Sequence, residues 1–143
     1  MRFWDASAIV PLLVEEPRSE AVDHALGTDP EMIVWWGTPV ECASGLARLE
    51  RAGHMNPDAV ETALDVLRRL ERASYEIGPS TGLRDVAVGL LRVHDLRAAD
   101  ALQLAAALEW SGRPASGEFM TFDRRLAQAA RREGFQVTDV YAG

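Results

Sequence analysis

The chain has 143 residues, 48% of them apolar, and a formal net charge of −7, which together fit one ordinary globular domain over residues 1–143. The acidic balance argues against a protein that coats nucleic acids, because such proteins carry a surplus of basic residues. The apolar runs are far shorter than the roughly 20 residues that span a bilayer, and no signal peptide precedes the first strand pattern, so we expect a cytoplasmic protein with no membrane contact.

The first predicted element is a short apolar run that leads directly into Asp5. We interpret residues 2–5 as a buried strand with an acid at its carboxyl end. Ser7 follows and can cap a helix over residues 7–14. Ligands of open α/β sheets lie outside the carboxyl ends of the strands. Asp5 is therefore a candidate active-site acid.

The rest of the chain alternates between strand and helix patterns. An apolar run over residues 32–36 predicts a second buried strand. Thr38, Pro39 and Glu41 then have the spacing of a capping box with Thr38 as N-cap, which predicts a helix to Arg51. This alternation implies a parallel sheet with helices on both faces. The other predicted helices cover 19–26, 80–94, 96–110 and 123–133, with one more beginning at 56–57, and the other predicted strands cover 75–77, 119–122 and 135–137.

Four acidic residues fall at the starts of predicted helices: Asp5, Glu41, Asp100 and Asp123. Each alone could serve its helix, as a cap or by complementing the helix dipole. If they converge on one edge of the sheet, however, they repel one another and raise one another's pKa values. A protein tolerates such a cluster most readily when a divalent cation neutralises it. Oxygen ligands with no Cys or His nearby favour Mg²⁺ or Mn²⁺ over Zn²⁺.

Four stretches resemble segments of the PIN-domain ribonuclease family, in order and over essentially the whole chain. They are FWDASAIVPLLVEEPRSE, TPVECASGLARLERAG, LRAADALQLAAAL and FMTFDRRLAQAARREGFQV. Within that family the chain resembles the VapC toxins of type II (VapBC) toxin–antitoxin modules. The resemblance implies a PIN-like α/β domain with a central parallel β-sheet flanked by helices in three layers, α/β/α.

The resemblance also implies roles for individual residues. The four acids correspond to the metal-binding and catalytic acids of the family, with Asp123 at a position that varies more than the others. Ser7 and Thr121 match hydroxyl positions that support the site by hydrogen bonding. None of the four acidic positions is substituted, which argues against a degenerate, inactive copy.

The activity that the resemblance implies is endonucleolytic hydrolysis of RNA, such as transfer or ribosomal RNA, with Mg²⁺ or Mn²⁺ and a metal-activated water. The products would carry a 5′-phosphate and a 3′-hydroxyl. The implied partners are a small VapB-type antitoxin that occludes the acidic site and a second copy of the chain in a homodimer. Arg124 and Arg125 directly follow the fourth acid and are candidates for contacts with RNA phosphates, and Arg97 is a weaker one.

Two alternatives within the family stay open: a PIN nuclease for RNA processing with no toxin role, and a catalytically silent module that binds RNA or protein. The intact acids favour a nuclease. Phosphoryl-transfer proteins of the haloacid dehalogenase and response-regulator types also place an Asp after the first strand. Those proteins use an active-site Lys, whereas all fifteen basic residues of this chain are arginine. A P-loop enzyme is excluded because its glycine-rich motif is absent.

Overall fold

The computed structural model describes residues 1–138 of the chain. Within them, five strands form one sheet in the order β3-β2-β1-β4-β5, and every neighbouring pair is parallel. The parallel sheet expected from the alternating pattern is therefore confirmed. The strands are β1 (Arg2–Trp4), β2 (Met32–Trp35), β3 (Tyr75–Ile77), β4 (Glu118–Met120) and β5 (Gln136–Val137).

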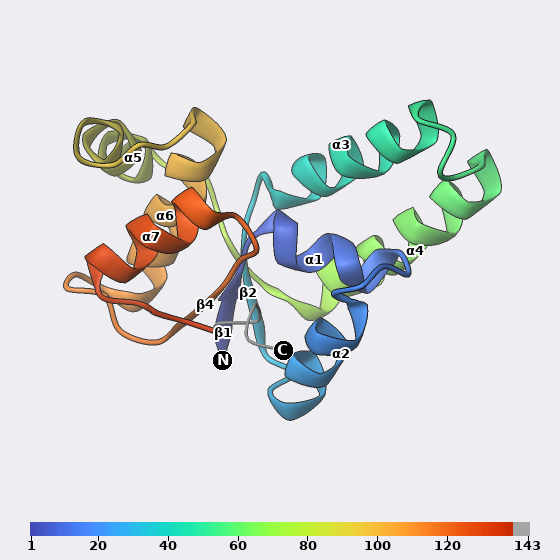
Figure 1. Ribbon diagram of the computed structural model, residues 1–143. Helices are drawn as coiled ribbons and strands as arrows, with labels where there is room; N and C mark the ends of the chain where they lie inside the picture. The colour runs from blue at the N-terminus through green and yellow to red at the C-terminus, as the bar shows by residue number, and fades with distance from the viewer. Residues whose placement is uncertain (139–143) are drawn as a thin grey trace.

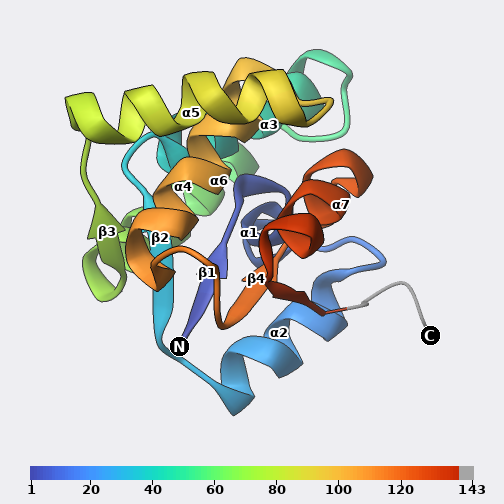
Figure 2. The same cartoon turned by 90° about the vertical axis from the view of Figure 1, so that its left-hand side faces the viewer.

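Helices cover both faces of the sheet in the described part of the chain, which confirms the three-layer α/β/α prediction (Figure 1). Figure 2 shows α5, α6 and α7 on the side of the sheet that faces the viewer. The other four helices lie behind it. The first group is α5 (Thr81–Val93), α6 (Ala98–Ser111) and α7 (Arg124–Glu133), and the second is α1 (Ala6–Leu13), α2 (Ser19–Thr28), α3 (Thr38–Arg51) and α4 (Pro57–Ala73).

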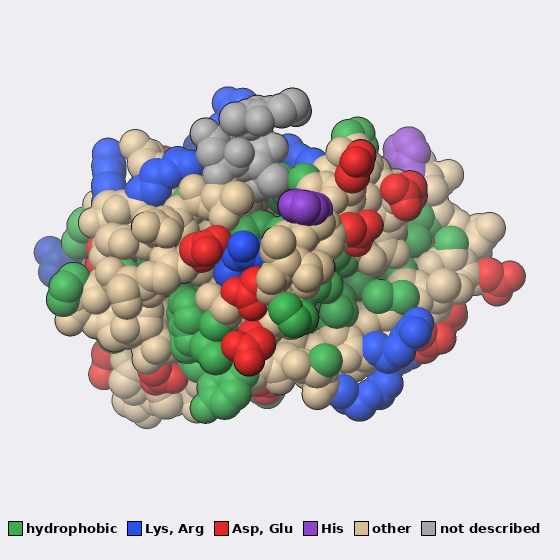
Figure 3. All heavy atoms as spheres, turned by 90° about the horizontal axis from the view of Figure 1, so that it is seen from below, with side chains coloured by type: hydrophobic (Ala, Val, Ile, Leu, Met, Phe, Trp, Pro, Cys, Tyr) green, Lys and Arg blue, Asp and Glu red, His purple; other side chains and the backbone are tan. Residues whose placement is uncertain are grey.

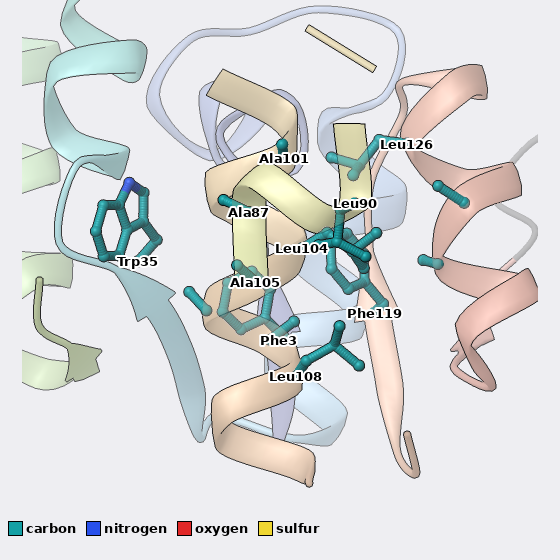
Figure 4. Close-up of a cluster of buried hydrophobic side chains, with 14 of the residues drawn as sticks. Phe3, Trp35, Ala87, Leu90, Ala101, Leu104, Ala105, Leu108, Phe119 and Leu126 are labelled. Atoms are coloured by element: carbon teal, nitrogen blue, oxygen red, sulfur yellow. The ribbon is translucent and has the colours of Figure 1, made fainter. Parts of the chain in front are cut away.

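Two hydrophobic cores hold these layers together, because successive residues of a strand point to opposite faces of the sheet. Phe3 packs with Ile33 and Phe119 in the core beneath α5, α6 and α7 (Figure 4). The rings of Phe3 and Phe119 stack with their centroids 5.1 Å apart. Trp4 packs with Met120 in the other core, against α1 to α4. The short first strand is thus anchored on both faces, which fixes the position of the residue that follows it.

The order of the strands reverses at β1. β2 and β3 lie on one side of it, and β4 and β5 lie on the other. Trp4 of β1 pairs with Met120 of β4, so the segments that follow these two residues leave the sheet side by side. In open α/β sheets, such a reversal opens the crevice in which ligands bind.

The predicted helix starts are partly confirmed. The side chains of Asn56, Ser80 and Asp123 each accept a hydrogen bond from the backbone N–H three residues further on, as helix caps do. The predicted caps Ser7 and Thr38 are wrong, because both residues lie inside their helices. Their hydroxyl groups bond instead to partners far along the chain.

The face of the protein opposite this crevice carries charges of both signs (Figure 3). Figure 3 views the protein from below, the side at which β1 begins, and acidic and basic side chains are both scattered over it. None of the helices formed by residues 1–138 is long and apolar enough to cross a membrane. The predicted domain extends to residue 143, and its last five residues lie outside the described part of the chain.

Candidate active site

Asp5 lies at the carboxyl end of β1 and occupies the N-cap position of α1, with only 4% of its surface exposed. Its backbone N–H donates to the carbonyl of Met120 in β4 at 3.1 Å. Its carboxylate makes no capping hydrogen bond to α1. Instead, Ser7 Oγ donates to Asp5 Oδ1 at 2.7 Å. The carboxylate is therefore buried and held in place without serving as a helix cap.

The hydroxyl of Ser7 joins the start of α1 to the segment after β4. Besides donating to Asp5, it accepts from the backbone N–H of Phe122 at 2.8 Å and lies 3.2 Å from Thr121 Oγ1. Thr121 Oγ1 in turn accepts from the backbone N–H of Asp123 at 3.0 Å. The two predicted supporting hydroxyls thus meet beside two of the predicted acids. The predicted cap at Ser7 fails because its hydroxyl is engaged in this network.

Glu41 reaches the site from the first turn of α3. It does not form the predicted capping box with Thr38, because α3 has Gly37 at its N-cap position and no side chain caps it. Both side chains contact Gln103 of α6 instead. Gln103 Nε2 donates to Glu41 Oε2 at 2.5 Å and to Thr38 Oγ1 at 2.9 Å. Glu41 is therefore oriented by a helix that is distant in sequence.

Gln103 is the site residue that the sequence reasoning missed. It is 1% exposed, and its buried Oε1 has no hydrogen-bond partner in the part of the chain that the structure describes. A signal was present: Gln103 is a polar residue within an apolar stretch of α6. It also follows Asp100 by three residues, which places the two on the same side of the helix.

The four predicted acids line one cavity of about 550 Å³ at the carboxyl ends of the strands. Asp5 follows β1, and Asp123 follows β4 and caps α7 by accepting from the backbone N–H of Leu126 at 2.9 Å. Glu41 and Asp100 come from the first turns of α3 and α6. The structure therefore brings all four acids together. Arg48 and Arg97 also line this cavity, and no Cys or His is among its lining residues.

Burial dominates the electrostatics of Asp5. Burial raises the pKa of Asp5 from 3.8 to about 7, even though hydrogen bonds from Ser7 and Thr121 act to lower it. The negative charge of Glu41 contributes to this rise. Asp5 is therefore a carboxylate whose charge no cationic side chain within residues 1–138 compensates by an ion pair.

The other acids are linked in the same way. Burial raises the pKa of Glu41 above its usual value; the hydrogen bond from Gln103 opposes this, and the charge of Asp100 adds to it. Burial likewise raises the pKa of Asp100, and the charge of Asp123 adds to the effect. The charged form of each of these three acids, Asp5, Glu41 and Asp100, is thus disfavoured by the charge of a neighbouring acid. Such a cluster is suited to attract a cation.

The donor set fits a hard, partly hydrated cation. No group of three or more His, Cys, Asp or Glu side chains within residues 1–138 is arranged to hold a metal ion alone. Mg²⁺, however, is usually bound through one or two carboxylates together with waters and substrate phosphates, and not in an all-protein cage. An open cavity lined by oxygen donors matches that mode of binding.

The predicted basic residues border the acids. Arg97, Arg124 and Arg125 line a neighbouring cavity of about 360 Å³, together with Asp100 and Asp123. Two of these three acid-flanking arginines lie in the first turn of α7, and Arg97 precedes α6. A phosphate that approaches the acids would meet guanidinium groups on this side.

Comparison with known proteins supports this picture. Residues 2–132 match the PIN domain family, whereas no curated protein matches the chain in sequence. VapC20 of Mycobacterium tuberculosis, a sarcin-ricin loop cleaving toxin, has a similar structure with a TM-score of 0.70 and 19% identity, over 95% of this chain and 97% of that chain. FitAcB of Neisseria gonorrhoeae has a TM-score of 0.69 and 17% sequence identity, over 100% of both chains. A chain of a toxin–antitoxin complex from Klebsiella pneumoniae has a TM-score of 0.64 and 17% sequence identity, over 89% of this chain and 91% of that chain. At these identities the structural similarity shows a shared fold.

Proposed function

Because the chain belongs to the PIN domain family, we propose that it is a metal-dependent endoribonuclease and the toxin of a type II toxin–antitoxin module. One observation carries this proposal: four carboxylates line a single cavity where the strand order of a parallel sheet reverses. Within residues 1–138, none of these acids is in an ion pair with an arginine or histidine. A site of this kind has capacity for a divalent cation and for the phosphate that the cation would bind.

In the proposed site, Asp5, Glu41 and Asp100 bind the metal, some of them through its bound waters, with Asp123 as a fourth acid. A bound Mg²⁺ or Mn²⁺ would lower the pKa of a water and neutralise charge that develops on the phosphate. The protein contributes orientation: the Ser7 hydroxyl fixes one oxygen of Asp5, and the Gln103 amide fixes one oxygen of Glu41. Such hydrogen bonds to ligand carboxylates hold their free oxygens toward the bound ion.

We propose RNA as the substrate, with transfer or ribosomal RNA as the class. The cleavage of the sarcin-ricin loop by VapC20, a protein of similar fold, supports this choice. Arg124 and Arg125 would contact phosphates beside the acids, with Arg97 as a further contact, because arginine binds phosphate through two parallel hydrogen bonds. The net charge of −7 is compatible with RNA binding, since only this rim needs to be basic.

The proposed partners are a VapB-type antitoxin and a second copy of the chain. Support for the antitoxin comes from similar structures, among them the toxin–antitoxin complex of Klebsiella pneumoniae and FitAB, which was solved bound to a DNA fragment. In cells, we expect expression of this protein to arrest growth, and we expect the product of a short adjacent gene to relieve that arrest. A protein that cuts RNA but leaves growth unchanged would instead be an RNA-processing nuclease.

The nuclease proposal is tested by incubating the purified protein with transfer and ribosomal RNA in Mg²⁺, in Mn²⁺ or in excess EDTA. We expect cutting only with metal, and a loss on the order of a thousandfold in Asp5→Asn and Asp100→Asn, because each removes one proposed ligand. Asp85→Asn, on the exposed side of α5, is the matched control and should cut like the wild type. Cutting that persists in EDTA would contradict the metal mechanism.

A further inference from the structure

A third cavity, of about 520 Å³, lies between α1 and α3 and adjoins the cavity of the four acids. We call it the α1–α3 groove. It continues the acid cavity, because four residues line both spaces. These shared residues are Ser7, Val10, Gly45 and Arg48. The acids therefore lie in the middle of a trough, with the cavity of Arg124 and Arg125 on one side and the α1–α3 groove on the other.

Arg48 stands at the junction of the two spaces. It follows Glu41 by seven residues, about two helical turns, so both lie on the same side of α3 and roughly 10 Å apart along its axis. The Arg48 side chain is exposed, and within residues 1–138 no carboxylate forms an ion pair with it. A guanidinium without an anion, close to an acidic site, is suited to bind a phosphate that enters with a substrate.

The lining of the α1–α3 groove matches a nucleotide. Arg18 lines it as well, and the guanidinium carbon of Arg18 lies 4.6 Å from the ring centroid of Phe122, a cation–π contact that helps to hold the guanidinium. Glu16 is the one acid among the lining residues that the structure describes. Apolar surface beside arginines can accommodate a base as well as its phosphate. The apolar lining residues are Val10, Pro11, Val14, Leu49 and Ala52.

We propose that the α1–α3 groove binds the RNA segment next to the scissile phosphate, with Arg48 contacting the flanking phosphate. An apolar groove can also take a protein helix. RNA is favoured here because the groove opens from the acid cavity and is bordered by two arginines, Arg18 and Arg48. This assignment rests on the proposed nuclease function and extends it to a second substrate contact, on the side of the acids opposite Arg124 and Arg125.

Gly45 offers a steric probe of the passage between the two spaces. A Cβ placed on Gly45 would lie 3.5 Å from Val10 Cγ2, which is an ordinary van der Waals distance, so a Cβ fits there, and the two cavities that Gly45 lines give space for the rest of a larger side chain. Glycine inside a helix is destabilising relative to residues such as alanine or leucine. A larger side chain at Gly45 should therefore leave stability equal or higher while it narrows the trough. If Gly45 were needed only for packing, a larger side chain would instead lower the stability of the protein.

The test measures how tightly the protein binds a short, random-sequence, single-stranded RNA pool. The RNA carries a fluorescent label at one end, binding is measured by fluorescence anisotropy, and EDTA prevents cutting. A random pool is suitable because phosphate contacts carry no sequence information. For Arg48→Gln we expect about tenfold weaker binding. The slope of log affinity against log salt should fall by about 0.7, as for one phosphate contact to a single strand. Arg51→Gln, exposed at the end of the same helix and outside both cavities, should bind like the wild type.

Gly45→Leu supplies the second arm. It should bind the RNA pool about tenfold more weakly, as expected for a blocked contact of this size, with an unfolding temperature no lower than that of the wild type. The proposal is overturned if Arg48→Gln matches Arg51→Gln and Gly45→Leu binds like the wild type. It is also overturned if both variants keep RNA binding but no longer bind the product of the adjacent short gene, because the groove then belongs to a protein. Failure of the proposed nuclease function can be distinguished from failure of this groove assignment. In that case the wild type would not cut RNA in the presence of metal, whatever the variants bind.

Discussion

Asp5 and Glu133 are both largely buried carboxylates, but their surroundings shift their pKa values in opposite directions. Glu133, at the end of α7, lies 2.6 Å from His94 Nε2 and accepts from Arg113 at 2.9 Å. Burial acts to raise the pKa of Glu133, but the hydrogen bonds from these two partners outweigh it and lower that pKa. Among residues 1–138, the donors that act on Asp5 are uncharged groups of Ser7 and Thr121, and the charged neighbour that acts on it is Glu41. Its pKa is therefore raised, to about 7.

This difference separates an acid with a structural role from the acid that we propose to bind the metal. The chain can give a buried carboxylate an arginine and a histidine as partners, as it does where Glu133 connects α7 to the end of α5. It does not do so at Asp5, although Arg48 and Arg97 line the same cavity. An unpaired, perturbed acid in a cleft is typical of a site whose compensation comes from a ligand. Substitutions at the two acids should consequently have opposite effects on stability.

The largest effect on stability is expected for Asp5→Asn in metal-free protein. Asp5 has a folded-state pKa of about 7 and an unfolded value near 3.8, so the folded state holds the proton more tightly. The wild type therefore loses stability as the pH rises through this window, by up to about 4 kcal/mol in total. Asparagine can still accept from Ser7 and carries no charge. Asp5→Asn should be more stable than the wild type at about pH 8, with the gain vanishing near pH 4.

Urea unfolding in EDTA at several pH values measures this gain. Asp85→Asn, which replaces an exposed acid, should show no comparable pH-dependent stabilisation. If Asp5→Asn were less stable than the wild type at about pH 8, the carboxylate of Asp5 would be favourably paired in the folded protein. The contrast with Glu133 would then be lost.

The next largest effect is expected for Gln103→Leu on RNA cutting. This variant removes the donor that orients Glu41, and loss of a group that orients a metal ligand typically costs about 10–100-fold in activity or metal affinity. Thr38→Val is the matched control, because it removes the other partner of the same amide and leaves the Glu41 contact in place. Kinetics of cutting at saturating Mn²⁺ and at limiting Mn²⁺ compare the two. Equal losses in both variants would mean that Gln103 acts only through packing.

A smaller effect is expected for Glu133→Gln, and on stability alone. Because the folded-state pKa of Glu133 is lowered, its contacts with His94 and Arg113 stabilise the protein above the unfolded pKa of about 4.5, and this contribution is lost as the pH falls through the lower folded value. We expect a loss of about 2 kcal/mol at neutral pH with RNA cutting unchanged. Asp65→Asn, in an exposed pair with Arg68, should cost less than about 0.5 kcal/mol. A fall in cutting by the folded Glu133→Gln protein would contradict a purely structural role.

The fold was predictable from sequence because its signals are local. Each predicted strand and helix is present within a few residues of its expected bounds, since periodicity, caps and glycine stops act over single turns. The predicted strand over residues 119–122 is shorter, ending at Met120. The backbone N–H groups of Phe122 and Asp123 bond to the hydroxyls of Ser7 and Thr121 instead of to a neighbouring strand.

The site was predictable only in part. Its acids stand where strands end or helices begin, and that placement is visible in the sequence. The orientation of Glu41 is not, because its partner Gln103 lies 62 residues away. For the same reason the local pattern assigned Ser7 and Thr38 as caps, whereas the tertiary structure uses their hydroxyls elsewhere. Side chains that act across the sheet become identifiable only once the helices are packed.

The central claim is that the four acids form one cation site, and metal-dependent thermal unfolding at about pH 8 tests it most directly. With Mn²⁺ at a hundred times its Kd, the wild type should gain about 2.7 kcal/mol, or roughly 5–10 °C in Tm. Glu133→Gln, although less stable from the outset, should gain as much, whereas Asp100→Asn should gain little or nothing. A wild type without any gain, or an Asp100→Asn variant that gains as much as the wild type, would contradict the account.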